Sequence, residues 1–139
     1  MPYSRLFYHF VWSTKNRLPL ITDSIRDPLY ASIRAKAVEL RGMVHALNGM
    51  PDHMHLVATV LPSMALSTFI GQVKGASSHL IGRLSGQPFA WQNEYGVFSV
   101  SESDLSVVVR YVIEQQKHHA ESSLEMGFER AADTGLAGA

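Results

Sequence analysis

Two histidines are separated by a single residue in an otherwise hydrophobic segment, NGMPDHMHLVATV, from Asn48 to Val60. Residues two apart on a β-strand share one face and lie roughly 6–7 Å apart at the backbone. His53 and His55 can therefore reach one metal ion. On spacing alone the alternative stays open that both are hydrogen-bonded structural residues, because a catalytic metal site usually has three protein ligands.

A tyrosine and a glutamine stand four residues apart in a second segment, VVVRYVIEQQKHHAE, from Val107 to Glu121. On a helix, Leu105, Val108, Val109 and Val112 form a core stripe. Tyr111 and Gln115 lie one turn apart on the flank of this stripe, where one small site can contact both. The alternative is that Tyr111 is a rim residue and that QQKHH is a solvated, basic helix end.

Composition limits the chemistry that such a site can perform. The chain has no cysteine, which excludes disulfides, thiolate metal sites and cysteine nucleophiles. The ligands left are His, Asp, Glu, Asn and Gln. Twelve basic and twelve acidic residues give no net charge, which counts against an indiscriminate nucleic-acid binder and is compatible with a local basic groove.

Length and hydrophobicity indicate one globular domain over residues 1–139, with 46% hydrophobic and 17% charged residues. No apolar run approaches the roughly 18 residues of a membrane span, and the start, MPYSRLFYHF, lacks the pattern of a signal peptide. We therefore expect a cytoplasmic protein that does not contact a membrane. The small residues of 129–139 are expected to fray.

Hydrophobic periodicity predicts alternating strands and helices that must position these residues. Strands are expected over residues 3–14, over two segments between 43 and 60 joined around Asn48 to Asp52, and within 88–101. Helices are expected over 23–40, over 63–85 and from about 101 to 128. The first helix is expected to bury Val38 in its core stripe and to stop at Gly42. The second is expected to begin at an N-cap, Ser63, and to stop at Gly86, and the last is expected to have Ser101 or Ser103 as its N-cap.

The resulting order, β α β β α β α, predicts an α+β fold of the ferredoxin-like or RRM-like kind. This arrangement has a four-stranded antiparallel sheet with two helices on one face, and here an additional C-terminal helix. The fold hosts many functions, so that function has to be inferred from the site.

The two motifs together resemble the single-tyrosine HUH transposases, the small transposases of single-strand insertion sequences and their domesticated relatives associated with repetitive palindromes. The resemblance runs from YHFVWSTKNRLPLI through MPDHMHLV to RYVIEQQKHH. It implies that His53 and His55 are the paired metal ligands, that Tyr111 is the catalytic nucleophile and that Gln115 is the third ligand.

The resemblance also implies an activity and partners. These are cleavage and rejoining of single-stranded DNA with hairpin structure, by transesterification through a 5′-phosphotyrosine. A site of two imidazoles and one amide oxygen fits Mn²⁺ and tolerates Mg²⁺. The resemblance implies a homodimer for the mobile members of the family, whereas some domesticated members act as monomers. We expect a homodimer in which the Tyr111 helix completes the partner's site, and assembly of the site within one chain stays open.

Further residues are assigned smaller roles. Candidate DNA contacts are Lys15, Arg17, Lys74, Arg83, His118 and His119, and the last two could equally be plain helix-end residues. Asp52 is expected to be a turn residue whose side chain points away from His53. Two other functions stay open: a non-catalytic single-strand-binding module that stacks bases on Phe7, Trp12, Trp91 or Tyr95, and a metal hydrolase with Tyr111 as an acid.

Overall fold

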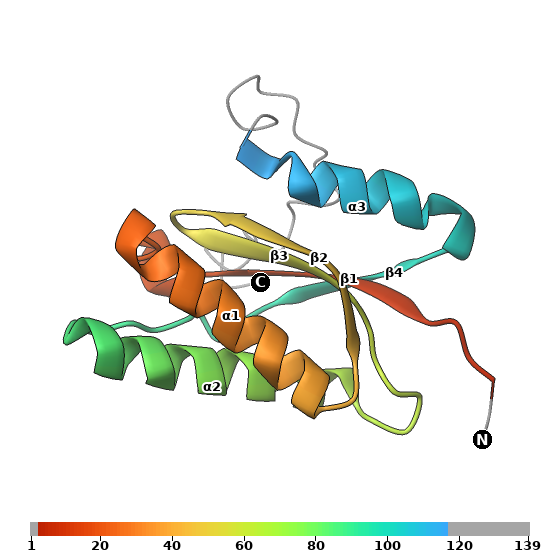
Figure 1. The fold of residues 1–139 in the computed structure, drawn as a ribbon, viewed down its shortest axis with the longest axis horizontal. Helices are drawn as coiled ribbons and strands as arrows, with labels where there is room; N and C mark the ends of the chain where they lie inside the picture. Colours follow the sequence, from red (N-terminus) through yellow and green to blue (C-terminus); the bar gives the residue numbers. More distant parts are fainter. Residues whose placement is uncertain (1–2, 117–139) are drawn as a thin grey trace.

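The computed structural model describes residues 3–116, which form an antiparallel sheet with helices on both faces (Figure 1). The strands are β1 (Phe7–Ser13), β2 (Met43–Met50), β3 (His53–Thr59) and β4 (Gly96–Val100), in the order β2-β3-β1-β4. The helices are α1 (Asp23–Glu39), α2 (Leu66–Ser85) and α3 (Leu105–Ile113), with the short 3-10 turns η1 (Lys15–Arg17) and η2 (Glu102–Asp104). The predicted ferredoxin-like fold is confirmed.

The main core lies between one face of the sheet and helices α1 and α2, which run together below the sheet in Figure 1. The strands contribute Phe10, Trp12, Met54, Leu56 and Ala58, and the helices contribute Leu29, Ile33, Ala37, Phe69, Ile70, Val73 and Ile81. The prediction that Val38 belongs to the core is wrong. The buried residues of α1 recur every fourth residue, so that Ala37 follows Leu29 and Ile33 into the core and Val38 is 63% exposed.

Helix α3 covers the opposite face, where it contacts β2 and β3 (Figure 1). Val108 and Val112 pack against Ala46 and Val57, with Leu105 and Val109 partly buried beside them. The predicted core stripe of this helix is therefore confirmed. The central strands β1 and β3 are buried on both faces, because helices cover both sides of the sheet.

Two predicted end signals are corrected, and a third is confirmed. Ser63 is not the N-cap of α2, because residues 61–64 form a turn and the helix begins after Ala65. After α1 the left-handed residue is Arg41, with φ of 64°, whereas Gly42 is required by space, since a Cβ there would lie 2.8 Å from the carbonyl oxygen of Thr59. Gly86 ends α2 in the left-handed conformation, as predicted.

The hairpin between β2 and β3 is tighter than predicted. The ladder continues through Met50 opposite His53, so that the turn consists of Pro51 and Asp52. Asn48, Gly49 and Met50 are therefore strand residues. This places Asn48 directly opposite His55 in the sheet.

The last strand is shorter than predicted, and the last helix is interrupted. β4 begins at Gly96, and the carbonyl oxygens of Gln92, Asn93 and Glu94 before it lie within hydrogen-bonding distance of Lys74 Nζ. Ser101 does cap the turn before α3, since its Oγ accepts from the Asp104 amide. The predicted helix is interrupted at Glu114, since α3 ends at Ile113 and Glu114 leaves helical geometry with ψ of 26°. Residues 115–116 are helical again, and the part of the helix predicted beyond residue 116 lies outside the described residues.

No helix within residues 3–116 has the length and apolar character that a membrane span requires.

Candidate active site

The residues of both motifs meet on the sheet face that α3 covers. The rings of His53 and His55 have centroids 5.2 Å apart, and the Tyr111 ring stands edge-on to His55 with centroids 6.1 Å apart. His53, His55 and Tyr111 are 1%, 0% and 5% exposed, so little solvent reaches this cluster. The alternation of β3 explains the histidines, since Met54 between them points into the opposite core.

Gln115 is also fully buried, although it follows the break at Glu114. Asn48 on β2 holds this part of the chain, because its Nδ2 donates to the carbonyl oxygen of Ile113 at 2.9 Å and to Gln116 Oε1 at 3.0 Å. Asn48 is the cross-strand partner of His55. The hydrogen bonds therefore fix the segment that carries Gln115 next to the strand pair that carries the histidines.

Asp52 contacts His53 directly, which corrects the expected direction of its side chain. It is a turn residue, as predicted, but its Oδ1 lies 2.7 Å from His53 Nδ1. In the tight Pro51–Asp52 turn, the carboxylate folds back along the strand instead of pointing away. A carboxylate at Nδ1 fixes that nitrogen as the donor and presents Nε2 to a metal.

Arg17 binds the carboxylate of Asp52 that contacts His53. Its Nε and Nη2 lie 3.1 and 3.0 Å from Asp52 Oδ2, and its Nη2 lies 3.4 Å from His53 Nδ1. Burial raises the pKa of Asp52, but His53 and Arg17 outweigh burial and hold the pKa of this carboxyl below its usual value. Asp52 therefore remains an ionised acceptor at neutral pH.

His9 on β1 is the residue of this cluster whose role was not predicted. Its Nε2 lies 2.8 Å from His55 Nδ1, and neither ring is exposed. The alternation of β1 places His9 on the α3 face with Val11, but the diagonal contact depends on the register of β1 with β3. Local spacing along the chain contains no signal for that register.

These donors fit a divalent metal ion. Each histidine uses Nδ1 for a protein partner, so that both rings would bind a metal through Nε2. Within residues 3–116, no three His, Cys, Asp or Glu side chains come together as a metal site. Among these residues a third protein ligand would therefore be of another type, and Gln115 offers a buried amide oxygen on the facing segment.

The predicted DNA contacts are spread over the molecule. Lys15 is exposed in η1, and Arg83 is exposed in the last turn of α2. Arg17 is engaged with Asp52, and Lys74 with the three carbonyl oxygens named above. Burial lowers the pKa of Lys74 to about 8. His118 and His119 lie outside the described residues.

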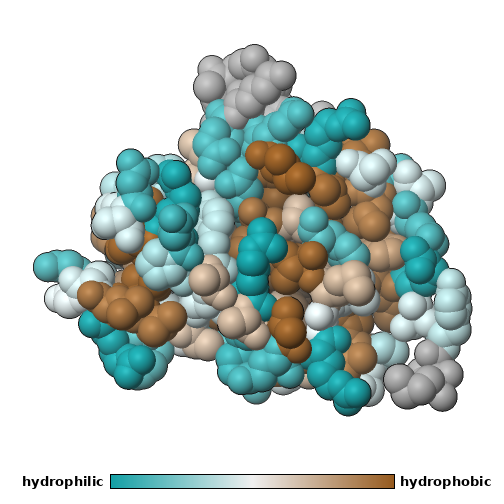
Figure 2. Space-filling view, viewed as in Figure 1, coloured by the Kyte–Doolittle hydropathy of each residue, from teal (hydrophilic) through white to brown (hydrophobic). Residues whose placement is uncertain are grey.

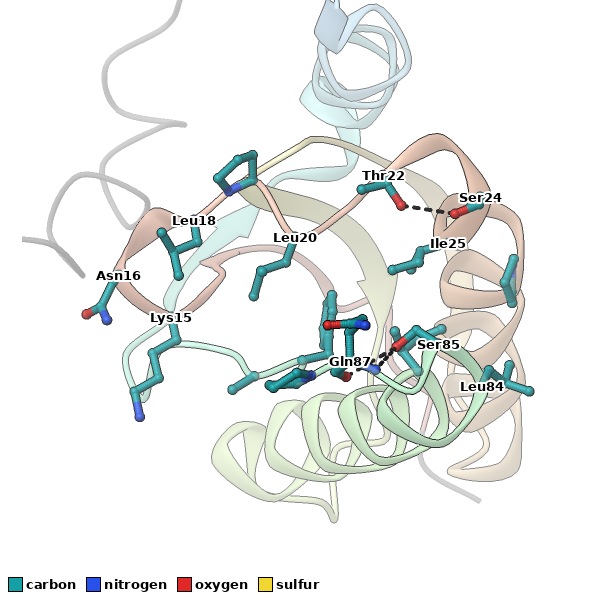
Figure 3. Close-up of a pocket in the computed structure, with 16 residues that line it drawn as sticks. Lys15, Asn16, Leu18, Leu20, Thr22, Ser24, Ile25, Leu84, Ser85 and Gln87 are labelled. Carbon is teal, nitrogen blue, oxygen red and sulfur yellow. Dashed lines mark hydrogen bonds between the residues drawn. The ribbon is translucent and has the colours of Figure 1, made fainter.

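A separate cavity of about 780 Å³ opens on the other side of the sheet from Tyr111, between residues 15–28 and 81–90. Leu20 and Ile25 point into it, whereas Lys15 and Asn16 extend away from it at one end (Figure 3). The histidine cluster does not line this cavity. Its walls are mainly aliphatic and proline side chains, and Lys15 is the one charged residue among those that line it.

Comparisons with known proteins agree with this geometry. The chain is 29% identical to the ISDra2 transposase TnpA of Deinococcus radiodurans over 119 residues, which cover 80% of this chain and 84% of that protein. The crystal structure of a provisionally named transposase from Deinococcus radiodurans superposes with a TM-score of 0.68 at 28% identity, over 83% of this chain and 95% of that one.

A second solved structure, a REP-associated tyrosine transposase bound to a REP hairpin, superposes with a TM-score of 0.65. It covers 86% of this chain and 74% of that one, and at 17% identity it shows likeness of fold alone. The family model described as "Transposase IS200 like" matches residues 2–116. The chain therefore belongs to the family of IS200-like transposases.

Proposed function

We propose that the protein cleaves and rejoins single-stranded DNA, with Tyr111 as the nucleophile and His53, His55 and Gln115 as the ligands of Mg²⁺ or Mn²⁺. The observation that carries this proposal is the edge-on contact of the Tyr111 ring with His55. It brings a phenol to a pair of imidazoles whose Nδ1 atoms are already held by the protein. Membership of a transposase family supports DNA as the substrate.

The proposed reaction is a transesterification at a DNA phosphodiester. The Tyr111 phenol loses its proton to solvent and its oxygen forms a bond to phosphorus. The bond from phosphorus to the 3′ oxygen breaks, and the released 3′ oxygen takes up a proton to become a 3′-hydroxyl. The product is a 5′-phosphotyrosine, and attack by another 3′-hydroxyl reverses the step and joins a new strand. The bond energy is retained in the tyrosyl ester, so that rejoining needs no nucleotide cofactor.

The site addresses two obstacles to this reaction. The phosphodiester is anionic, and a phenol in water has a pKa of about 10, which makes it a weak nucleophile at neutral pH. A divalent ion at His53, His55 and Gln115 would neutralise phosphate charge and orient the reacting groups. The fixed position of Tyr111 on α3, close to the sheet, supplies the alignment that such a displacement requires.

The proposed substrate is single-stranded DNA with a hairpin. A structural neighbour in complex with a REP hairpin supports this choice, although it shares only the fold. Exposed Lys15 and Arg83 are proposed to contact phosphates, and partly buried Arg17 is proposed to do so beside the site. Because the substrate is DNA, we keep the cytoplasm as the expected location.

The alternative of a stacking module is less well supported. Phe7, Trp12 and Trp91 are 6%, 0% and 8% exposed, so none of them offers a ring face to a base. Only Tyr95 of the four proposed aromatic residues is partly exposed, and its ring packs near Lys74. A hydrolase with Tyr111 as an acid would use the same residues without forming a covalent product.

We also propose a homodimer that exchanges α3. In the described chain, Tyr111 reaches the histidines of its own sheet, and a partner's helix could make the same contacts. Val107 and Ile113 on α3 are 63% and 59% exposed, and Figure 2 shows hydrophobic surface in the part of the view that α3 occupies. Such surface favours a protein partner, and η2 provides a short connection across which the helix could cross over.

The test is a denaturing gel of the purified protein with fluorescent single-stranded DNA that contains hairpins from the sequence flanking its gene. We expect a covalent protein–DNA band that needs Mg²⁺ or Mn²⁺ and is lost with chelator. Duplex DNA of the same sequence is the control and should give no band. Cleavage of the single strand without a covalent band would support the hydrolase instead, and binding without cleavage would support the stacking module.

A further inference from the structure

His9 and His55 form a buried pair of imidazoles across two strands. They are diagonal neighbours, because His9 lies opposite Val57 and His55 lies opposite Val11 in the β1–β3 register. The planes of the two rings make an angle of 25° and their centroids are 5.1 Å apart, and His9 Nε2 lies 2.8 Å from His55 Nδ1. Phe98 of β4 packs near the His9 ring, with centroids 6.0 Å apart.

The contact couples the protonation sites of the two rings. A hydrogen bond between two ring nitrogens contains one hydrogen, so one nitrogen donates and the other accepts. If His9 Nε2 carries the hydrogen, neutral His55 must carry its own hydrogen on Nε2 and cannot bind a metal there. If His55 Nδ1 carries it, Nε2 of His55 has a lone pair for the metal, and His9 is the Nδ1–H tautomer.

We propose that His9 is a positioning residue that holds His55 as the Nδ1–H tautomer and fixes the direction of its Nε2. This inference rests on the proposed function, because it assigns His55 to the metal. His53 receives the equivalent contact from the carboxylate of Asp52. The two ligands of the pair are thus oriented by different groups, one by an anion from a turn and one by a neutral base from the neighbouring strand.

Because the contact is buried, its loss is expected to affect His55. Both rings are 0% exposed, so that water cannot readily replace an acceptor removed from His55. The contact also lies on the side of His55 away from its metal-binding nitrogen, and His9 itself is not needed as a ligand. Loss of the acceptor should therefore change the tautomer of His55 and loosen the direction of its Nε2, while the side chain stays buried at the same position.

The test compares His9→Phe, which keeps a ring but has no acceptor, with His9→Gln, which offers an amide oxygen. Phe98→Leu is the matched control, because it changes the packing beside His9 and keeps the acceptor. Thermal unfolding of each variant establishes that it is folded. Nitrogen-15 NMR of the imidazoles in metal-free protein reports the tautomer of His55, and calorimetric titration with Mn²⁺ reports affinity.

In the wild type we expect the Nδ1–H tautomer of His55. His9→Phe should lose that tautomer preference and weaken Mn²⁺ binding by about 10- to 100-fold. His9→Gln and Phe98→Leu should keep both properties close to those of the wild type. An unchanged tautomer and affinity in folded His9→Phe would overturn the proposal, and so would an Nε2–H tautomer in the wild type.

The two proposals fail in different ways. Wild-type protein that binds neither Mn²⁺ nor Mg²⁺ would refute the proposed metal site, whatever the state of His9. Wild-type protein that binds metal and forms the covalent DNA product, with His9→Phe binding equally well, would leave the proposed function intact and refute the role of His9. The tautomer is measured without metal or DNA, and it decides the role of His9 independently of cleavage.

Discussion

Asn48 and Gln116 hydrogen-bond to each other through both ends of their amides. Asn48 Nδ2 donates to Gln116 Oε1, and Gln116 Nε2 donates to Asn48 Oδ1, each at 3.0 Å. Gln116 Nε2 also donates to the Gly49 carbonyl oxygen at 2.9 Å. The pair ties the chain after α3 to the strand beside His55, so that Tyr111 and Gln115 are held over the histidines from both sides of the break at Glu114.

Replacing Asn48 should therefore affect the rate at which the covalent DNA product forms more than the free energy of unfolding. We expect Asn48→Ala to lower the free energy of unfolding by about 1–2 kcal/mol, because partly exposed hydrogen bonds contribute about 0.5–1.5 kcal/mol each. Formation of the covalent DNA product should slow by about tenfold or more, because Gln115 and Tyr111 lose their alignment. Chemical denaturation and timed denaturing gels measure the two effects.

Asn93→Ala is the matched control for this variant, because Asn93 is exposed and contacts Lys74 through its backbone carbonyl oxygen. A double-mutant cycle with Gln116→Ala should give a favourable coupling energy between the two amides. Additive effects of the two substitutions would show that the reciprocal pair does not act as a unit.

Replacement of the proposed metal ligands should abolish cleavage. We expect His53→Ala or His55→Ala to slow cleavage at least about a thousandfold, because a metal supplies several kcal/mol of charge stabilisation and about 1.4 kcal/mol corresponds to tenfold. Gln115→Ala should be milder, since water can partly replace a neutral amide ligand. The measurement is single-turnover cleavage, with exposed His79→Ala as the control.

Chelator should have the same effect on the wild type, and Mn²⁺ or Mg²⁺ should restore activity. Undiminished cleavage in chelator would exclude a metal from the reaction.

Mixing two inactive chains tests the exchange of α3. A Tyr111→Phe chain and a His53→Ala chain should each be inactive alone. In an exchanged heterodimer one site contains both substitutions and the other contains neither, so that activity returns at one site in about half of the dimers, as expected for random mixing. The measurement is covalent product formation after subunit mixing, confirmed by differently tagged chains.

If mixed dimers form and stay inactive, each site is assembled within one chain, in the arrangement that the described chain already has.

Lys74 should make stability depend on pH above neutrality. Burial lowers its pKa from 10.5 to about 8, against a smaller opposing effect of Glu94. Between these values the unfolded chain holds more protons than the folded one, so that stability rises as pH increases. We expect the stability of the wild type relative to Lys74→Met to increase from pH 7.5 to 9.5, measured by chemical denaturation.

Lys15→Met is the control for this comparison, because Lys15 is exposed in η1. An equal pH dependence in wild type and Lys74→Met would show that Lys74 titrates with an ordinary pKa.

The order of elements and the main site residues followed from periodicity along the chain. The alternation of HMHLV determines that His53 and His55 share a face. The four-residue spacing of Tyr111 and Gln115 predicts that they lie on one side of a continuous helix, which the structure interrupts at Glu114. Both patterns are local. The role of His9 was not predictable in this way, because its contact with His55 depends on how β1 and β3 are aligned.

The corrections have the same origin. The direction of Asp52 depends on the tightness of a two-residue turn, and the residues before β4 contact Lys74, which lies 18 to 20 residues earlier in the chain. Tertiary contacts of this kind override local propensity. The sequence therefore predicts which of the candidate site residues come together better than it predicts the contacts that orient them.

The central claim is that Tyr111 becomes covalently joined to DNA. The direct measurement is mass spectrometry of the protein after reaction with single-stranded hairpin DNA and nuclease trimming, together with the same reaction of Tyr111→Phe. We expect a 5′-phosphorylated nucleotide on Tyr111 in the wild type, and no adduct in Tyr111→Phe although that variant is folded and binds the DNA. An adduct on another residue, or one that persists in Tyr111→Phe, would contradict the assignment of Tyr111 as the nucleophile.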